Sequence, residues 1–229
     1  MAIGVQLADL VRGVRAESGK SLSVALGVAE YDSIVYQLQS KQEQLYYDYD
    51  WPFLITQAPV ALINGTRYYP FPPTISFDFV NEVWCSEDDT TSFTPVTYGI
   101  GPTQFNQFGV GVTGWPARHW MISGSQIETW PVPSQAGFLR VIGRRALTPL
   151  VASSDLSTLD GTLLVLFVAA DILARQKSED ARIKLTAAQR YLRNIVRRQT
   201  SNKTNPIILG GGLHSHVRHL RPGLDYIPS

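Results

Sequence analysis

Residues 45–63, LYYDYDWPFLITQAPVALI, contain the point at which this chain changes from helix to strand. Before Trp51, apolar residues recur at helical spacing, whereas short alternating runs begin at Ile55. Pro52 marks the change, because a proline disfavours the helical conformation of the residue before it. We therefore expect a helix that ends near Tyr49 and a β-rich segment that follows it.

Two helices are predicted before this point, over residues 6–16 and 30–47. In both, apolar residues recur at the i, i+3, i+4 and i+7 spacing of an amphipathic helix. In the longer helix, Gln42 falls on the buried stripe, so its amide needs hydrogen-bond partners inside the protein. The other members of that stripe are aliphatic or aromatic: Tyr31, Ile34, Val35, Leu38, Leu45, Tyr46 and Tyr49.

Helical periodicity returns over residues 161–199. Asp160 is placed to cap the first turn of a helix, and residues 163–174 are apolar nearly all round, which indicates a central, buried helix. A second helix is predicted after Ser178. Its charged side carries five arginines: Arg182, Arg190, Arg193, Arg197 and Arg198.

Between the two helical blocks, residues 55–146 have the short alternating runs and frequent turns of a small β-sandwich or barrel. A tight hairpin is predicted around Asn64 and Gly65, and a second one around Gly124. Further strands are expected at residues 75–84, 96–98 and 138–142. Residues 99–114 form a long predicted loop, and such loops are often functional or part of an interface.

The predicted fold class is α+β: a helical bundle formed by the N- and C-terminal helices, an inserted small β-sandwich or barrel, and an extended C-terminal arm. The chain divides accordingly into residues 1–54, 55–146, 147–199 and 200–229. The last part has no core of its own, yet it holds more large aliphatic side chains than a disordered tail usually does. This mixture predicts a segment that becomes ordered on a partner.

Composition limits the possible functions. Cys85 is the single cysteine among 229 residues, which excludes an internal disulfide framework. The apolar run at residues 163–174 is about half as long as a membrane span requires, and the N-terminus lacks the pattern of a signal peptide. We therefore expect a soluble chain.

Charged residues make up 17% of the chain, less than the usual quarter, so part of the surface is expected to be covered by neighbours.

The net charge of +1 hides an asymmetry along the chain. Residues 1–170 hold 9 Lys and Arg against 15 Asp and Glu, whereas residues 171–229 hold 11 against 4. An acidic body and a basic end can attract each other in adjacent copies of the chain. The alternative is a solvated helix face followed by a disordered basic end, and both interpretations stay open at this point.

Three patterns with possible chemistry lack the context that the chemistry needs. Residues 109–114, GVGVTG, match a dinucleotide-binding pattern, but Pro116 follows and no helix can begin there to receive a phosphate. The three histidines within residues 214–219 lack a rigid element to present them to a metal. Cys85 is expected to be a core residue rather than a nucleophile with His119 as its base. We predict no enzyme, no metal and no cofactor.

The five tryptophans raise the possibility of carbohydrate binding, because flat aromatic rings can stack on sugars. The candidates are Trp115, Trp120 and Trp130. We favour the alternative that these rings fill the core of the small β-domain.

Three stretches carry a resemblance to a known family. They are residues 37–54, QLQSKQEQLYYDYDWPFL; residues 65–70, GTRYYP; and residues 127–133, IETWPVP. Together with the order of helices, β insertion and returning helices, they resemble the head-to-tail adaptor proteins of short-tailed phages, in particular the tail tubular protein A family. The likeness extends over about residues 1–200, mainly as a pattern.

The resemblance implies a structural protein of the virion neck, assembled in the host cytoplasm as a homo-oligomeric ring, usually a dodecamer. Such a ring docks on the portal protein, extends the channel for genomic DNA and meets the tail nozzle protein, without contacting a membrane. It implies that Arg190, Arg193 and Arg197 lie at the subunit interface and that residues 206–228 form an arm on the portal. The candidate portal-binding residues are Ile207, Ile208, Leu209, Leu213, Val217, Arg218, Leu220, Arg221 and Tyr226.

Two other functions remain as alternatives. In the first, the chain is another tail component, such as a nozzle protein or a carbohydrate-binding module. In the second, it is a free nucleic-acid-binding protein with a basic C-terminal end. The nucleic-acid alternative predicts a DNA affinity that falls steeply with salt concentration.

Overall fold

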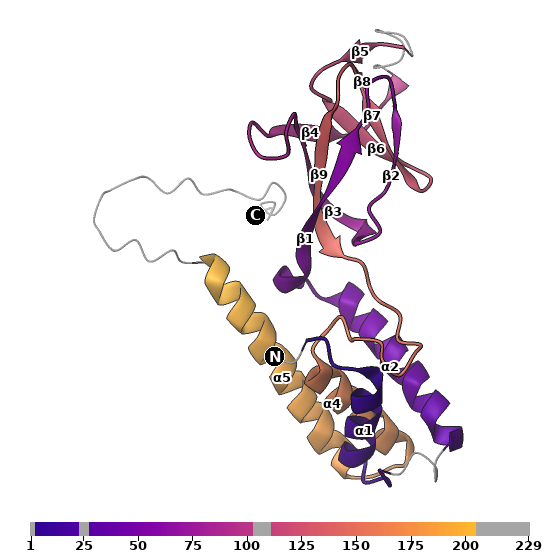
Figure 1. Ribbon diagram of the computed structural model, residues 1–229. Coiled ribbons are helices and arrows are strands. Elements are labelled where there is room, and N and C mark those ends of the chain that lie inside the picture. Colours follow the sequence, from indigo (N-terminus) through magenta and orange to yellow (C-terminus); the bar gives the residue numbers. More distant parts are fainter. Residues whose placement is uncertain (1–2, 23–27, 103–110, 205–229) are drawn as a thin grey trace, which may run out of the picture.

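The computed structural model describes residues 3–22, 28–102 and 111–204. Figure 1 shows an elongated molecule with a helical body at one end and a β-domain at the other. The helical body comprises α1 (Leu7–Glu17), α2 (Val28–Asp48), α4 (Gly161–Arg175) and α5 (Asp180–Thr204). The β-domain is inserted between α2 and α4, which confirms the predicted α+β class.

Helix α4 lies at the centre of the helical body, where it packs against α1, α2 and α5. Its start is set as the sequence predicts, because the Asp160 carboxylate accepts a hydrogen bond from the Leu163 N–H at 3.0 Å. Gly13 lets α1 approach α4 closely, since a Cβ at this position would lie 3.1 Å from the side chain of Val165 on α4. The helical core is therefore built around the apolar helix that the sequence marks as central.

The buried amide of Gln42 ties α2 to the segment that returns from the β-domain. Its Oε1 accepts a hydrogen bond from the Thr158 N–H at 2.9 Å, and its Nε2 donates to the Thr148 carbonyl at 3.1 Å. Both predicted hydrogen-bonding needs of this side chain are thus met.

Seven strands form one sheet in the order β1-β9-β3-β4-β6-β7-β2. The strands are β1 (Ile55–Leu62), β2 (Tyr68–Pro70), β3 (Ile75–Ser86), β4 (Thr94–Tyr98), β6 (His119–Ser123), β7 (Gln126–Trp130) and β9 (Gly137–Arg145). The edge strands β1 and β2 contact each other, so the sheet nearly closes into a barrel. The short strands β5 (Thr113–Gly114) and β8 (Val132–Pro133) pair beside it.

The tight hairpin predicted around Asn64 and Gly65 is wrong. Strand β1 pairs with β9 over its whole length, and β2 pairs with β7. Long-range pairing wins here because β9 offers β1 eight partner residues, more than a short hairpin can supply. The turn at Asn64 and Gly65 itself forms, with the Thr66 N–H donating to the Ile63 carbonyl at 3.1 Å. The Tyr69 hydroxyl supports it by donating to the Thr66 carbonyl at 2.7 Å and accepting from the Ile63 N–H at 3.2 Å.

The other predicted strands are present. The hairpin around Gly124 is formed by β6 and β7, and the runs predicted at residues 75–84, 96–98 and 138–142 correspond to β3, β4 and β9. Helix α5 continues to Thr204, beyond the predicted end at residue 199. Within the predicted loop at 99–114, residues 103–110 lie outside the described residues.

Candidate assembly surfaces

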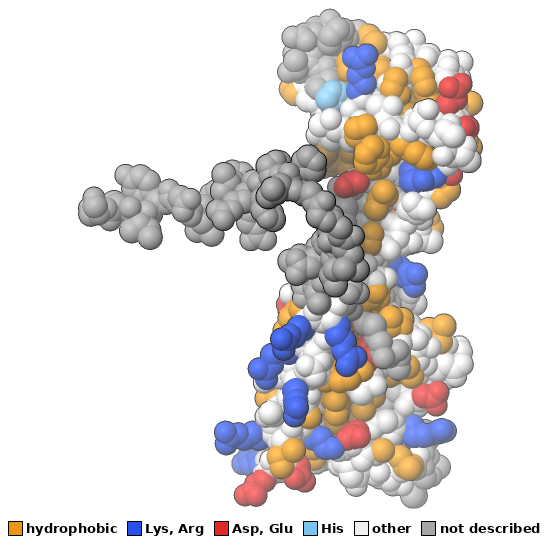
Figure 2. Space-filling view, turned by 90° about the vertical axis from the view of Figure 1, so that its left-hand side faces the viewer, with side chains coloured by type: hydrophobic (Ala, Val, Ile, Leu, Met, Phe, Trp, Pro, Cys, Tyr) orange, Lys and Arg blue, Asp and Glu red, His pale blue; other side chains and the backbone are white. Residues whose placement is uncertain are grey.

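The exposed side of α5 carries a row of arginines. Arg190, Arg193 and Arg197 are exposed and, with Asn194, line a shallow hollow of about 410 Å³. They lie together because residues three or four apart share one face of a helix. Figure 2 shows Lys and Arg side chains gathered on this side of the helical body. The structure therefore brings together the three arginines for which the resemblance implies a place at a subunit interface.

Helix α5 is strongly basic. The helix holds seven Lys and Arg and a single Asp. Lys184 pairs with Glu17, but no carboxylate among the described residues forms an ion pair with Arg190 or Arg193. Exposed guanidinium groups in a row can bind carboxylates or phosphates through paired hydrogen bonds.

A second site of interest is the joint between the helical body and the β-domain. The Arg144 side chain, 7% exposed, donates from Nη1 to the Tyr46 carbonyl at 2.6 Å and from Nη2 to Asp50 at 3.1 Å. Its guanidinium carbon lies 3.9 Å from the centre of the Phe79 ring, and the Tyr46 hydroxyl donates to the Arg145 carbonyl at 2.8 Å. This network joins the end of α2 to β9 and β3, so it fixes how the two parts are oriented.

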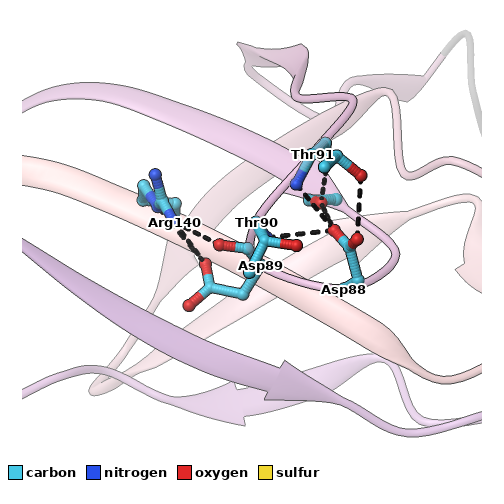
Figure 3. A network of polar contacts seen from close by, with 6 residues as sticks. Asp88, Asp89, Thr90, Thr91 and Arg140 are labelled. Atoms are coloured by element: carbon cyan, nitrogen blue, oxygen red, sulfur yellow. Dashed lines mark hydrogen bonds and ion pairs between the residues drawn. The ribbon is translucent and has the colours of Figure 1, made fainter.

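The turn between β3 and β4 is held by its own polar groups (Figure 3). The Asp88 carboxylate accepts hydrogen bonds from the Thr91 N–H at 2.8 Å and from the Thr90 N–H at 3.0 Å. These bonds stabilise the ionised form, so the pKa of Asp88 lies well below its usual value. Arg140 binds the neighbouring Asp89 at 2.9 Å. The turn is thus preorganised on the surface of the β-domain.

Neither the cysteine nor the tryptophans form a site. Cys85 lies in the barrel core, and its burial raises the pKa of the thiol, which disfavours the reactive thiolate. Trp120 and Trp130 are only 5% and 7% exposed, so their faces are not available to stack on a sugar. Trp115 packs against Gly137, where a Cβ would collide with the indole ring. Trp120 belongs to the barrel core and the half-buried Trp115 packs against it, as predicted, whereas Trp130 is buried outside that cluster.

A groove of about 540 Å³ opens where β3 and β4 part, and the sequence analysis missed it. Its walls include the exposed rings of Phe77 and Tyr98 and the half-buried Trp84. The groove arises because β4 pairs with β3 over only three residues before it turns to run parallel to β6. The lengths of the predicted strands do not indicate where β4 separates from β3.

The described residues contain no group of three or more His, Cys, Asp or Glu arranged to hold a metal. Among the helices of the same part of the chain, none is both long and apolar enough to cross a bilayer.

All candidate portal-binding residues, and the three histidines of residues 214–219, lie outside the described residues. The dinucleotide-like pattern lies partly outside them as well, and its last residues, Thr113 and Gly114, form strand β5 rather than the start of a helix.

The described residues thus form a β-domain joined to a helical body through the Arg144 network, with exposed arginines on α5. A family model described as SU10 adaptor protein matches residues 5–209. The chain therefore belongs to the SU10 adaptor protein family and is a structural adaptor of a phage. A comparison with curated proteins finds no match. Family membership confirms the resemblance to head-to-tail adaptors and the prediction that the chain is not an enzyme.

Proposed function

We propose that this chain forms the head-to-tail adaptor ring of its virion. The ring docks on the portal protein, extends the channel for genomic DNA and connects it to the tail nozzle protein. Family membership supports the role of adaptor. The observation that favours a ring is the row of exposed arginines on α5, in which Arg190 and Arg193 form no ion pair among the described residues.

In this proposal each part of the chain has one task. The helical body holds the ring together, with Arg190, Arg193 and Arg197 at the subunit interface. Residues 206–228 form the arm on the portal, where aliphatic side chains enter apolar pockets and Arg218 and Arg221 bind carboxylates. The β-domain meets the tail, and the joint at Arg144 keeps it in a fixed orientation. The usual copy number of such rings is twelve.

The excess of carboxylates in residues 1–170 supports a role in DNA passage. A channel lined mainly by carboxylates repels the phosphates of the genome, so the DNA does not adhere to the wall. The basic residues are then used in contacts between proteins rather than in contacts with nucleic acid.

Deletion of residues 206–229 tests the proposal. We expect the truncated chain to keep its circular dichroism spectrum and thermal midpoint, because both described cores lie before residue 205. It should fail to co-sediment with the portal protein of the same virus. The control is a full-length chain in which residues 206–229 are scrambled, which separates sequence from length. Infectious particles that contain the truncated chain would overturn the proposed function.

A further inference from the structure

The outer face of α2 carries a stripe that alternates carboxylates and aromatic rings. Tyr36 and Tyr47 are 71% and 51% exposed, although tyrosine usually buries most of its ring. The members of the stripe follow steps of four, four, three and four residues and are all exposed: Asp32, Tyr36, Ser40, Glu43 and Tyr47. The exposed rings and carboxylates together form a surface suited to cationic side chains.

The arginine row of α5 has the same spacing. Its members also follow steps of four, four, three and four residues and are all exposed: Arg182, Thr186, Arg190, Arg193 and Arg197. Each stripe is about 22 Å long at the rise of an α-helix. When the two helices run side by side in the same direction, Glu43 faces Arg193 and Tyr47 faces Arg197. Asp32 then faces Arg182, so that both carboxylates of the stripe meet an arginine.

The shape of the α2 surface also suits a helix. Tyr36, Ser40 and Glu43 form one wall of a groove of about 390 Å³, and the opposite wall is formed by Thr148 and Pro149. Side chains in a row on one helix pack into such a groove beside another helix. Arginine is well suited to this groove, because a guanidinium can pair with a carboxylate such as that of Glu43 or stack on an exposed aromatic ring.

The two carboxylates of the α2 stripe, Asp32 and Glu43, are unpaired in the part of the chain that the structure describes. Helix α2 holds four Asp and Glu and a single lysine, Lys41, which pairs with Asp171 on α4. Glu30 pairs with Lys20. No ion pair among the described residues involves Asp32 or Glu43. Asp32 and Glu43 on α2 and Arg182 and Arg193 on α5 are therefore complementary charges, and none of the four forms an ion pair among the described residues.

The two surfaces cannot meet within one chain or within a symmetric dimer. Helices α2 and α5 lie on opposite sides of α4, and both run toward the β-domain (Figure 1). In a two-fold symmetric dimer, both subunits use the same patch, so α2 and α5 would both have to lie in that one patch. When copies are related by rotation about a common axis, α5 of each copy can contact α2 of the next copy. Such head-to-tail contacts close into a ring when the rotation closes.

We propose that α5 of one copy packs in parallel on α2 of the next, with Arg193 against Glu43 and Arg182 against Asp32. The partner of the arginine row is thus a second copy of this chain. This inference rests on the proposed ring, and it names the surface that receives the arginines.

Charge reversal tests the pairing. We expect Glu43→Arg or Arg193→Glu alone to lower the fraction of chain in rings at least about tenfold, because like charges then face each other at every interface. The combined variant, with both reversals in each chain, should recover ring formation to within about threefold of the native chain. Rings are counted by mass photometry and negative-stain electron microscopy, with and without the portal protein.

Matched controls lie on the same two helices. Asp48→Arg and Arg198→Glu reverse exposed charges of the same kinds, but each lies about 100° around its helix from the stripe. Both should assemble like the native chain. A loss of rings in these controls equal to that in the stripe variants would overturn the inference, because net charge alone would then explain the effect.

Cross-linking separates this inference from the proposed function. A chain with both Glu43→Cys and Arg193→Cys should give an oxidised ladder of trimers and larger species, whereas each single variant should stop at dimers. Cys85 is buried and does not contribute. Rings without the ladder and without rescue overturn the pairing and leave the adaptor ring intact. A chain that forms no ring, alone or on the portal, contradicts both.

Discussion

Three arginines of the β-domain and two of α5 are used in opposite ways. Arg67, Arg140 and Arg144 are each bound to a carboxylate of their own chain, with little of the side chain exposed. Arg190 and Arg193 are exposed, and no described carboxylate pairs with them. The difference indicates that the first group maintains the fold, whereas the second group is available to other chains.

Substitutions in these two groups of arginines should affect different properties: the stability of the monomer or the assembly of the ring. Removing one partner of a buried ion pair leaves a desolvated charge and lowers the free energy of unfolding strongly. Removing an exposed arginine changes that free energy little. Stability measured on the monomer and assembly measured on the ring should therefore respond to different sets of residues.

The largest expected effect is at Glu128, which is buried beside Arg67 and accepts a hydrogen bond from its Nε at 2.7 Å. Glu128→Ala should lower the free energy of unfolding by about 3 kcal/mol, because it leaves the Arg67 charge without its carboxylate. Urea unfolding followed by tryptophan fluorescence measures this change. The double variant with Arg67→Met should be more stable than the single one, and a double variant that is less stable would contradict the account.

A somewhat smaller effect is expected at the joint. Arg144→Ala should lower the free energy of unfolding by about 2 kcal/mol, because the Tyr46 carbonyl loses a charged donor and the contact with Phe79 is lost. The exposed Asp50 contributes little to this figure. Arg145→Ala, an exposed neighbour on the same strand, is the control and should stay within about 0.5 kcal/mol of the native chain.

The turn between β3 and β4 should respond to pH. The pKa of Asp88 in the folded chain lies below its unfolded value of about 3.9, so its stabilising contribution is present above pH 4 and is lost as the pH falls further. The native chain should therefore be more stable than Asp88→Asn at pH 5, with a difference that shrinks toward pH 2. Urea midpoints at several pH values test this. Glu87→Gln is the control, and a difference that stays constant with pH would exclude Asp88 as its source.

The smallest expected effect on stability is at the arginine row. Arg190→Ala combined with Arg193→Ala should change the free energy of unfolding of the monomer by less than about 0.5 kcal/mol. The measurement is urea unfolding at a dilution where the native chain is monomeric. A loss of 2 kcal/mol or more would show that these arginines maintain the fold and would remove the contrast with the β-domain.

The elements that the sequence predicts well are those with local signals. Pro52 restricts the backbone of the residue before it, and the Asp160 side chain caps the start of α4, so both act locally. The arginine row is visible because its spacing is helical. The partner of β1 is not visible, because β9 follows more than 70 residues later and the local turn signal at Asn64 and Gly65 points to a different pairing.

The two assembly surfaces differ in the same respect. The arginine row is recognisable from residue type alone, whereas the α2 stripe depends on which face of α2 packs against α4. Tyr36 and Tyr47 lie off the predicted buried stripe of α2, but only the packed structure shows that 71% and 51% of these side chains are exposed. The groove between β3 and β4 is still harder to foresee, because it depends on where two strands separate.

The most direct test of the account is a cryo-electron microscopy reconstruction of the ring bound to its portal. We expect α5 of each copy to lie along α2 of the next, with the Arg193 guanidinium within 4 Å of the Glu43 carboxylate, about the limit for an ion pair. The low-exposure arginines of the β-domain should keep their contacts within the chain. A ring in which the arginine row of α5 faces solvent or the DNA channel would contradict the central claim.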